Sequence, residues 1–311
     1  MERKLLFITG PKKTATSKLA LMLNCHQDIF ISYEWNIANN AISKHAKKFL
    51  AQYPEARFLF REDESLVVLY SELEKFFQKR GFKFSIIGDK LPGIKKRLLN
   101  KFSPYKVIFT IRDLESWLCK DVVQKTYLTN YDVVPTAIDY CSLFLNSFRT
   151  KDILRLRMAD IIQDDRRTLD KIGTFFDMEL ANMGFNWRNQ LNQLENHSLY
   201  AFDKWWEGPS HGTAALKSSN FDTFTEIRPH PFWDTILTIF NKYYTQIDGN
   251  FSKAEIDDDS AKLKTLMQFS ALPIDKAYTS VENKELIKEK NIGPLKRFKK
   301  TIKKKLKALQ G

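Results

Sequence analysis

Short apolar runs, each followed by turn residues and a longer helical pattern, recur through the first half of the chain. Runs of Ile, Val, Leu and Phe that are apolar on both faces are typical of central strands in a parallel sheet. We expect strands at Leu5–Thr9, Phe84–Gly88, Val107–Ile111 and Ile153–Leu156, with a weaker one at Ile29–Ser32. Helices are expected between them, near Ser17–Asn24, Ser65–Arg80, Glu115–Tyr127, Thr136–Arg149 and Arg167–Phe176. The alternation predicts a doubly wound α/β fold, a three-layer sandwich with a central, mainly parallel sheet.

The chain divides by composition into an α/β domain and a C-terminal helical tail. A helix near Phe232–Tyr244 is expected to close a domain over residues 1–250, after a stretch at 185–230 that reads as long loops. Residues 251–311 are predicted to form a linker or peripheral helix and then a basic amphipathic helix. Apolar side chains recur at spacings of three and four in this last helix, at Leu295, Phe298, Ile302, Leu306 and Leu309.

The net charge of +13 is concentrated at the C-terminal end. Residues 291–311 contain eight Lys and Arg and no acidic residue, so the rest of the chain carries only +5. A mildly basic body gives no reason to expect a specific nucleic-acid partner. The basic helix fits an anionic membrane surface, a nucleic-acid contact or a solvated tail, and its regular apolar spacing favours the membrane surface.

The sequence also predicts the cellular location of the protein and whether it holds a metal. The apolar stretch Leu5–Ile8 is only a strand long, so we expect no signal peptide, and no apolar run is long enough for a transmembrane helix. Cys25, Cys119 and Cys141 are too few and too scattered for a disulfide framework or a zinc site, and the five histidines show no metal-ligand spacing. We therefore expect a cytoplasmic protein without a metal, peripheral at the inner face of a membrane.

The first candidate site is the basic, hydroxyl-rich turn between the first strand and the first helix. Residues 10–17 read Gly-Pro-Lys-Lys-Thr-Ala-Thr-Ser. A turn of this kind at a helix N-terminus directs backbone N–H groups, hydroxyls and ammonium groups at one point, which suits a phosphate or sulfate. It is not a Walker A loop, because the second glycine with its Gly-Lys-Ser/Thr sequence is missing. Taken alone, an ordinary strand–turn–helix with solvated lysines explains the turn equally well.

This turn resembles the 5′-phosphosulfate loop of sulfotransferases, which reads roughly Pro-Lys/Arg-Ser-Gly-Thr-Thr. Lys13, Thr14 and Ala15 stand where the family has serine, glycine and the first threonine. Threonine adopts positive φ poorly, so the sequence leaves open whether the turn keeps the family's tight form. The matching positions are Pro11, Lys12 and Thr16.

A second segment, residues 106–118, resembles the 3′-phosphate motif of the same family. A hydrophobic strand there ends at Arg112, and a guanidinium at a strand's carboxyl end suits a phosphate monoester. The family carries a serine eight positions after this arginine, where the present chain has Lys120. The alternative is that Arg112 simply pairs with Asp113 or another neighbouring carboxylate.

Three further segments follow in the family's order. Residues 88–92, which contain Lys90, resemble its Glu/Asp-Lys-Thr/Ser-Pro segment, and residues 33–36 resemble a stretch whose glutamate, here Glu34, is the catalytic base in glycan-type members. Residues 153–162 and 169–176 resemble its late strand, turn and helix, with Ala159 replacing the usual glutamate. Taken singly, the segments around Lys90 and Glu34 read as surface turns or edges of the core.

The resemblance covers roughly residues 4–245 and implies a P-loop-like sulfotransferase fold. The implied reaction moves a sulfuryl group from 3′-phosphoadenosine 5′-phosphosulfate (PAPS) to a hydroxyl of a carbohydrate or similar acceptor, leaving adenosine 3′,5′-bisphosphate. Two alternatives stay open. One is a catalytically inactive sulfotransferase-like binding protein, and the other is a different P-loop nucleotide-dependent enzyme such as a small-molecule kinase.

The resemblance also assigns roles to residues. Lys12 would clamp the leaving phosphate, Glu34 would accept the proton of the acceptor hydroxyl, and Lys90 would neutralise charge on the sulfuryl group or orient the acceptor. Arg112 and Lys120 would hold the 3′-phosphate. The residues implied to bind the 5′ end of PAPS are Pro11, Lys12, Lys13, Thr14, Ala15, Thr16 and Ser17.

Overall fold

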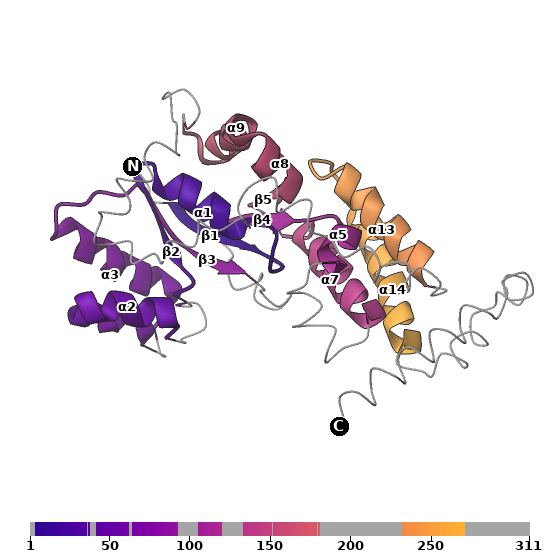
Figure 1. Ribbon diagram of the computed structural model, residues 1–311, viewed down its shortest axis with the longest axis horizontal. Coiled ribbons are helices and arrows are strands. Elements are labelled where there is room, and N and C mark those ends of the chain that lie inside the picture. Colours follow the sequence, from indigo (N-terminus) through magenta and orange to yellow (C-terminus); the bar gives the residue numbers. More distant parts are fainter. Residues whose placement is uncertain are drawn as a thin grey trace, which may run out of the picture. The chain divides into compact units, whose positions relative to one another are not determined.

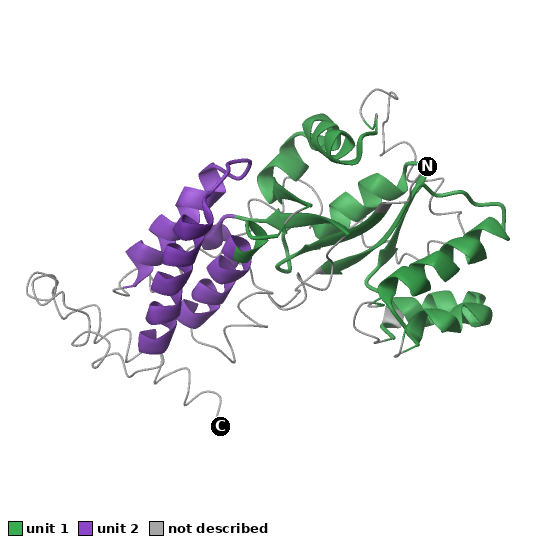
Figure 2. Cartoon of the chain, turned by 180° about the vertical axis from the view of Figure 1, so that it is seen from behind, with its two compact units in different colours: residues 1–112, 146–217 green, residues 113–145, 218–311 purple. Residues whose placement is uncertain are grey.

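A computed structural model of the chain forms two compact units, which Figure 2 colours separately. Unit 1 consists of residues 1–112 and 146–217, and unit 2 of residues 113–145 and 218–311. The structure describes residues 4–35, 37, 42–61, 64–92, 105–119, 133–150, 152–178, 180 and 232–270. The predicted loops at 185–230, the predicted helix at 291–311 and Lys120 lie outside these ranges.

Unit 1 is built on a five-stranded, all-parallel sheet with the order β2-β3-β1-β4-β5 (Figure 1). Its strands are β1 (Lys4–Gly10), β2 (Ile29–Tyr33), β3 (Ile86–Pro92), β4 (Lys106–Ile111) and β5 (Ile153–Arg157). The prediction of an α/β fold with a parallel sheet is confirmed, including the weaker strand β2. The β1 side chains Leu6, Phe7 and Ile8 are fully buried, as expected for a central strand with both faces covered.

The third strand begins and ends later than its sequence pattern predicts. β3 runs on through Asp89 and Lys90, which the pattern alone places in a surface turn or at an edge of the core, and both residues are 0% exposed. Its register pairs Ser32 with Asp89 and Tyr33 with Lys90. The Ser32 hydroxyl donates to Asp89 Oδ1 at 2.7 Å, and Lys90 Nζ donates to Glu34 Oε1 at 2.5 Å and to Ser17 Oγ at 3.1 Å. Because both charged groups have polar partners, the strand can continue where a pattern of apolar residues stops.

Helices cover both faces of this sheet. Right-handed crossovers place α1, which leads from β1 out to β2, on the opposite face from the segments that lead back from β2 to β3. The edge-to-face contact of Phe7 with Tyr70, at 5.6 Å between ring centroids, places α3 against the second face. These helices of unit 1 are α1 (Thr16–Asn24), α2 (Lys44–Gln52), the 3₁₀ helix η2 (Pro54–Phe60), α3 (Leu66–Gln78), α8 (Met158–Gln163) and α9 (Asp165–Phe176).

A buried lysine ties α1 to the last two helices of unit 1. Lys18 is only 7% exposed, and its Nζ donates to the Ile161 carbonyl at 2.8 Å and to Asp165 Oδ1 at 2.6 Å. These bonds place α8 and α9 beside α1. The expected three-layer arrangement is therefore present in unit 1.

Unit 2 packs helices α5 (Leu114–Leu118), α13 (Trp233–Thr245), α14 (Lys253–Ser270) and most of α7 (Val133–Ser147). Its core is aromatic: Trp117 lies 4.1 Å from Tyr140, and Phe144 lies 5.5 Å from Phe240, between ring centroids. α14 occupies part of the segment predicted to be a linker or peripheral helix. Among the described residues, no helix is both long and apolar enough to cross a bilayer.

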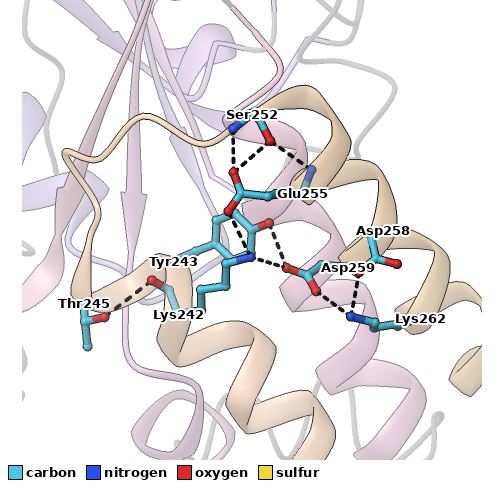
Figure 3. Close-up of polar contacts among 8 residues, drawn as sticks. All are labelled: Lys242, Tyr243, Thr245, Ser252, Glu255, Asp258, Asp259 and Lys262. Atoms are coloured by element: carbon cyan, nitrogen blue, oxygen red, sulfur yellow. Dashed lines mark hydrogen bonds and ion pairs between the residues drawn. The ribbon is translucent and has the colours of Figure 1, made fainter.

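The start of α14 is fixed by a reciprocal pair of hydrogen bonds. The Ser252 hydroxyl accepts the Glu255 N–H at 3.2 Å, and Glu255 Oε2 accepts the Ser252 N–H at 2.9 Å, which is a capping box (Figure 3). One turn later the buried Asp259 carboxylate accepts hydrogen bonds from Lys242 Nζ at 2.9 Å and the Tyr243 hydroxyl at 3.0 Å. These bonds fasten α14 to α13.

The turn after β1 depends on close contacts with β4. Gly10 has a φ of +144°, and a Cβ there would lie 2.2 Å from the Thr110 carbonyl oxygen, so this position requires glycine. The Thr14 hydroxyl donates to the Pro11 carbonyl at 2.7 Å and lies 2.7 Å from Thr110 Oγ1. Thr14 is 0% exposed. Its side chain therefore holds the turn closed from inside.

We predict that the Thr14 hydroxyl stabilises this turn. Thr14→Val keeps the shape but leaves the Pro11 carbonyl without its partner, and it should lower the free energy of unfolding by about 1–3 kcal/mol. Thr14→Ser keeps the hydroxyl and should cost under about 1 kcal/mol. Urea unfolding measures both, and equal stability of the two variants would contradict this role. Thr14→Gly, which restores the family residue, should be no more stable than Thr14→Val.

We further predict that Asp259 stabilises unit 2 in a pH-dependent way. Burial opposes ionisation, but hydrogen bonds from Lys242, Tyr243 and Lys262 and the positive charge of Lys242 together outweigh it and hold the pKa of Asp259 below its usual value. Its contribution is therefore present at neutral pH and is lost as the pH falls through the folded-state pKa. Asp259→Ala should lower the free energy of unfolding by about 1–3 kcal/mol at neutral pH, and the difference from wild type should shrink in acid.

The matched control for this prediction is Asp258→Ala. Asp258 pairs only with Lys262 among the described residues and is 65% exposed, so its removal should cost under about 1 kcal/mol. Chemical unfolding followed across the acid range distinguishes the two variants. A pH-independent loss for Asp259→Ala, or equal losses for both variants, would show that the carboxylate does not act in this way.

Candidate functional site

The strand order gives the sheet a point where the direction of winding changes. From β1 the chain crosses past β3 to β2, whereas from β4 it continues outward to β5 on the other side. Ligands in open α/β sheets bind outside the carboxyl ends of the strands where the direction of winding changes in this way. The segments that leave this edge include the turn at Pro11–Ala15, Glu34 after β2 and Arg112 after β4.

The turn after β1 presents the N-terminus of α1. Ala15, with φ of 68°, is the N-cap residue and supplies no side-chain cap to the N–H groups of the first helical turn. Uncapped N–H groups and the helix dipole together attract an anion. Lys12 and Lys13 in the same turn have exposed side chains. The turn thus offers backbone donors and two positive charges at one end of a nine-residue helix.

The missing glycine does not prevent a tight turn. Positive φ values fall on Lys13 and Ala15, at 68° each, on either side of Thr14. The strain of these two left-handed residues is of the order of 1 kcal/mol each, and the bonds of the Thr14 side chain oppose it. Because that hydroxyl donates inward to the Pro11 carbonyl, Thr14 has a supporting role in this structure. Direct binding of a ligand by its side chain stays a prediction.

Lys90 is the buried centre of the site. Its Nζ donates to Glu34 Oε1 at 2.5 Å and to Ser17 Oγ at 3.1 Å, and it lies 3.3 Å from the centroid of the Tyr33 ring. The Lys90 side chain is 0% exposed and that of Glu34 is 35% exposed. Glu34 has a φ of 54°, and its N–H donates to the Lys90 carbonyl at 3.0 Å. The structure thus joins Lys90, Glu34 and Ser17, which are far apart in sequence, into one cluster.

Burial makes the charge of Lys90 sensitive to its surroundings. Desolvation lowers the pKa of Lys90 to about 8, although the nearby Glu34 carboxylate raises it in part. Asp89 raises this pKa further, and Lys13 from the turn lowers it. An added anion beside Lys90 and Lys13 would favour the ammonium form. The site is therefore electrostatically suited to a negatively charged ligand.

Arg112 directly follows β4 and is 2% exposed. β4 pairs with β1 through Thr9 and Phe109, so Arg112 leaves the sheet at the same edge as the turn. The next residue, Asp113, is the N-cap of α5 and accepts the Ser116 N–H at 2.8 Å. A buried guanidinium at a strand end is well suited to a phosphate monoester. Lys120, predicted to assist it, lies outside the described residues.

Two residues of this arrangement are not among those predicted from the sequence. Tyr33 contacts Lys90 and also bonds Ser17, with 2.8 Å between the two hydroxyl oxygens. Thr110 lies within the apolar run of β4 and bonds Thr14. The position of Tyr33 beside Glu34 is a signal that could identify the former. For Thr110 no local pattern exists, because its role depends on the register of β4 against β1.

Comparisons with known proteins give structural similarity without sequence similarity. The sequence matches no family model and no curated protein. The sulfotransferase domain of the Synechococcus PCC 7002 olefin synthase has 13% identity and a TM-score of 0.39, covering 88% of this chain and 98% of that domain. The sulfotransferase domain of the curacin biosynthetic pathway has 15% identity and a TM-score of 0.43, with coverages of 85% and 98%.

Mouse sulfotransferase SULT7A1, whose structure is a complex with PAP, is similar at 13% identity and a TM-score of 0.38, covering 85% of this chain and 90% of the mouse chain. All three similarities extend over most of the present chain.

Proposed function

We propose that this protein transfers a sulfuryl group from PAPS to a hydroxyl of a carbohydrate or similar acceptor. The observation that carries the proposal is the donor set at the carboxyl edge of the sheet. The uncapped N-terminus of α1, the exposed Lys12 and Lys13, and the buried Lys90 and Arg112 all belong to this edge. These groups fit a ligand with several separate anionic groups, such as PAPS.

The proposed roles follow from what each group can donate or accept. The N–H groups of the first turn of α1, with Thr16 and Ser17, would bind the 5′-phosphosulfate end, and Lys12 would stabilise the charge that develops on the leaving phosphate. Arg112 would hold the 3′-phosphate through bidentate hydrogen bonds. PAPS supplies the transferable sulfuryl group when bound. The protein then has to position this group and neutralise its charge.

Glu34 and Lys90 would act on the acceptor side. The Glu34 carboxylate is anchored by Lys90 on one oxygen, and its side chain is 35% exposed. It would accept the proton of the acceptor hydroxyl, because a general base needs a positioned lone pair within hydrogen-bonding reach. Lys90 would keep that carboxylate in place and add positive charge beside the transferring group. Carbohydrate as the acceptor rests on the resemblance of residues 33–36 to glycan-type members.

We predict that Lys12 carries a large part of the catalysis. Lys12→Ala should reduce sulfuryl transfer from ³⁵S-labelled PAPS to a panel of carbohydrate acceptors by about 100-fold or more, because it removes a charge that stabilises the leaving phosphate. The matched control is Lys47→Ala, which removes an exposed lysine of α2 and should leave the rate unchanged. Undiminished transfer by Lys12→Ala would overturn the assigned role.

A further inference from the structure

Tyr33 makes two separate contacts with the proposed site. The face of its ring lies 3.3 Å from Lys90 Nζ, and its hydroxyl lies 2.8 Å from Ser17 Oγ. His45, near the start of α2, meets the ring edge-on at 5.0 Å between centroids. His45 of α2 thus packs against one side of the ring, while the ring face contacts Lys90 of β3 and the hydroxyl contacts Ser17 of α1.

The hydroxyl of Ser17 can serve an anion only if its own proton is available. Ser17 Oγ accepts a hydrogen bond from Lys90 Nζ at 3.1 Å. A hydroxyl oxygen has two acceptor positions, so the second one can take the proton of the Tyr33 hydroxyl. Burial raises the pKa of Tyr33 to about 12, so this phenol holds its proton at neutral pH. An anion at the turn would select this arrangement, because Ser17 then donates outward.

The ring of Tyr33 acts on a second hydrogen-bond donor of the proposed site, the Lys90 ammonium. The ring quadrupole attracts a desolvated ammonium on the aromatic face, which favours the charged form of Lys90. The other charged groups around Lys90 in the described structure are Glu34 from the end of β2, Asp89 from β3 itself and Lys13 from the turn. Loss of the ring would leave these charges in place and remove only the aromatic contribution.

We propose that Tyr33 is a positioning residue for anion binding: its hydroxyl orients the Ser17 hydroxyl outward as a donor, and its ring holds the Lys90 ammonium. The Ser17 part rests on the proposed function, since it requires an anion at the turn. The part of the proposal that concerns Lys90 does not depend on the proposed function. Tyr33 itself touches neither the acceptor nor the reacting atoms in this scheme.

The test separates hydroxyl from ring with two variants. Tyr33→Phe removes only the hydroxyl, and by calorimetry it should weaken binding of adenosine 3′,5′-bisphosphate by roughly three- to tenfold. In a Ser17→Ala background the same change should have no further effect. Tyr53→Phe removes the hydroxyl of another partly buried tyrosine, in the aromatic cluster with Phe49 and Phe76, and should leave affinity unchanged. An unchanged affinity of Tyr33→Phe, or an equal loss with and without Ser17, would overturn the Ser17 part.

The second readout needs no ligand. In protein labelled with ¹³C at lysine Cε, the Lys90 signal, assigned with Lys90→Arg, should titrate near pH 8 in the wild type. Tyr33→Leu should shift this titration roughly one pH unit lower, whereas Tyr33→Phe should shift it much less. An unshifted titration in Tyr33→Leu would overturn the Lys90 part. If the wild type binds no adenosine 3′,5′-bisphosphate, the proposed function fails together with the Ser17 part, while the Lys90 titration still decides the other part.

Discussion

A fully buried ammonium group inside a parallel sheet is the constraint on which the site depends. Lys90 is 0% exposed, and burial of an unpaired charge would cost several kcal/mol. The Glu34 carboxylate, the Ser17 hydroxyl and the Tyr33 ring offset this cost from three directions. These partners come from the end of β2, the start of α1 and β2 itself. One buried charge therefore ties β3, which carries Lys90, to β2 and to the start of α1.

The turn after β1 reaches a tight form without the glycine that its resemblance to the family calls for. Its sequence lacks the glycine found at this point in sulfotransferases, and positive φ falls instead on Lys13 and Ala15. Thr14 then holds the turn through the Pro11 carbonyl and Thr110 Oγ1. A side chain thus replaces the conformational freedom of glycine. This geometry closes the turn and leaves the start of α1 without a side-chain cap, although the motif is altered.

Much of the fold follows from local patterns, because the apolar runs at β1, β2, β4 and β5 predict strands close to their observed positions. The end of β3 does not follow from such a pattern, because Asp89 and Lys90 look like a surface turn or an edge of the core until their partners are known. α2 is also missed by these patterns, because its lysines obscure the apolar residues Ala46 and Phe49 that it buries. For α14 the pattern predicts only a linker or peripheral helix, since much of its surface is polar and charged.

The residues of the candidate site can be predicted one by one, but their contacts cannot. Lys90 and Glu34 appear in the order of the family's motifs, yet their 2.5 Å ion pair depends on the pairing of β2 with β3. The same pairing brings Tyr33 against Lys90, a contact that no linear motif encodes. Long-range register, rather than residue type, thus determines which predicted residues act together.

Nucleotide selectivity tests the central claim most directly. If the edge of the sheet holds a 5′-phosphosulfate and a 3′-phosphate, calorimetry should show tight binding of adenosine 3′,5′-bisphosphate and no comparable binding of ATP. Arg112→Lys should weaken binding of adenosine 3′,5′-bisphosphate, because it loses the bidentate geometry. Preference for ATP would point to a kinase-like enzyme, and binding of neither nucleotide to an inactive binding protein. Either result would contradict a PAPS site at the carboxyl edge of this sheet.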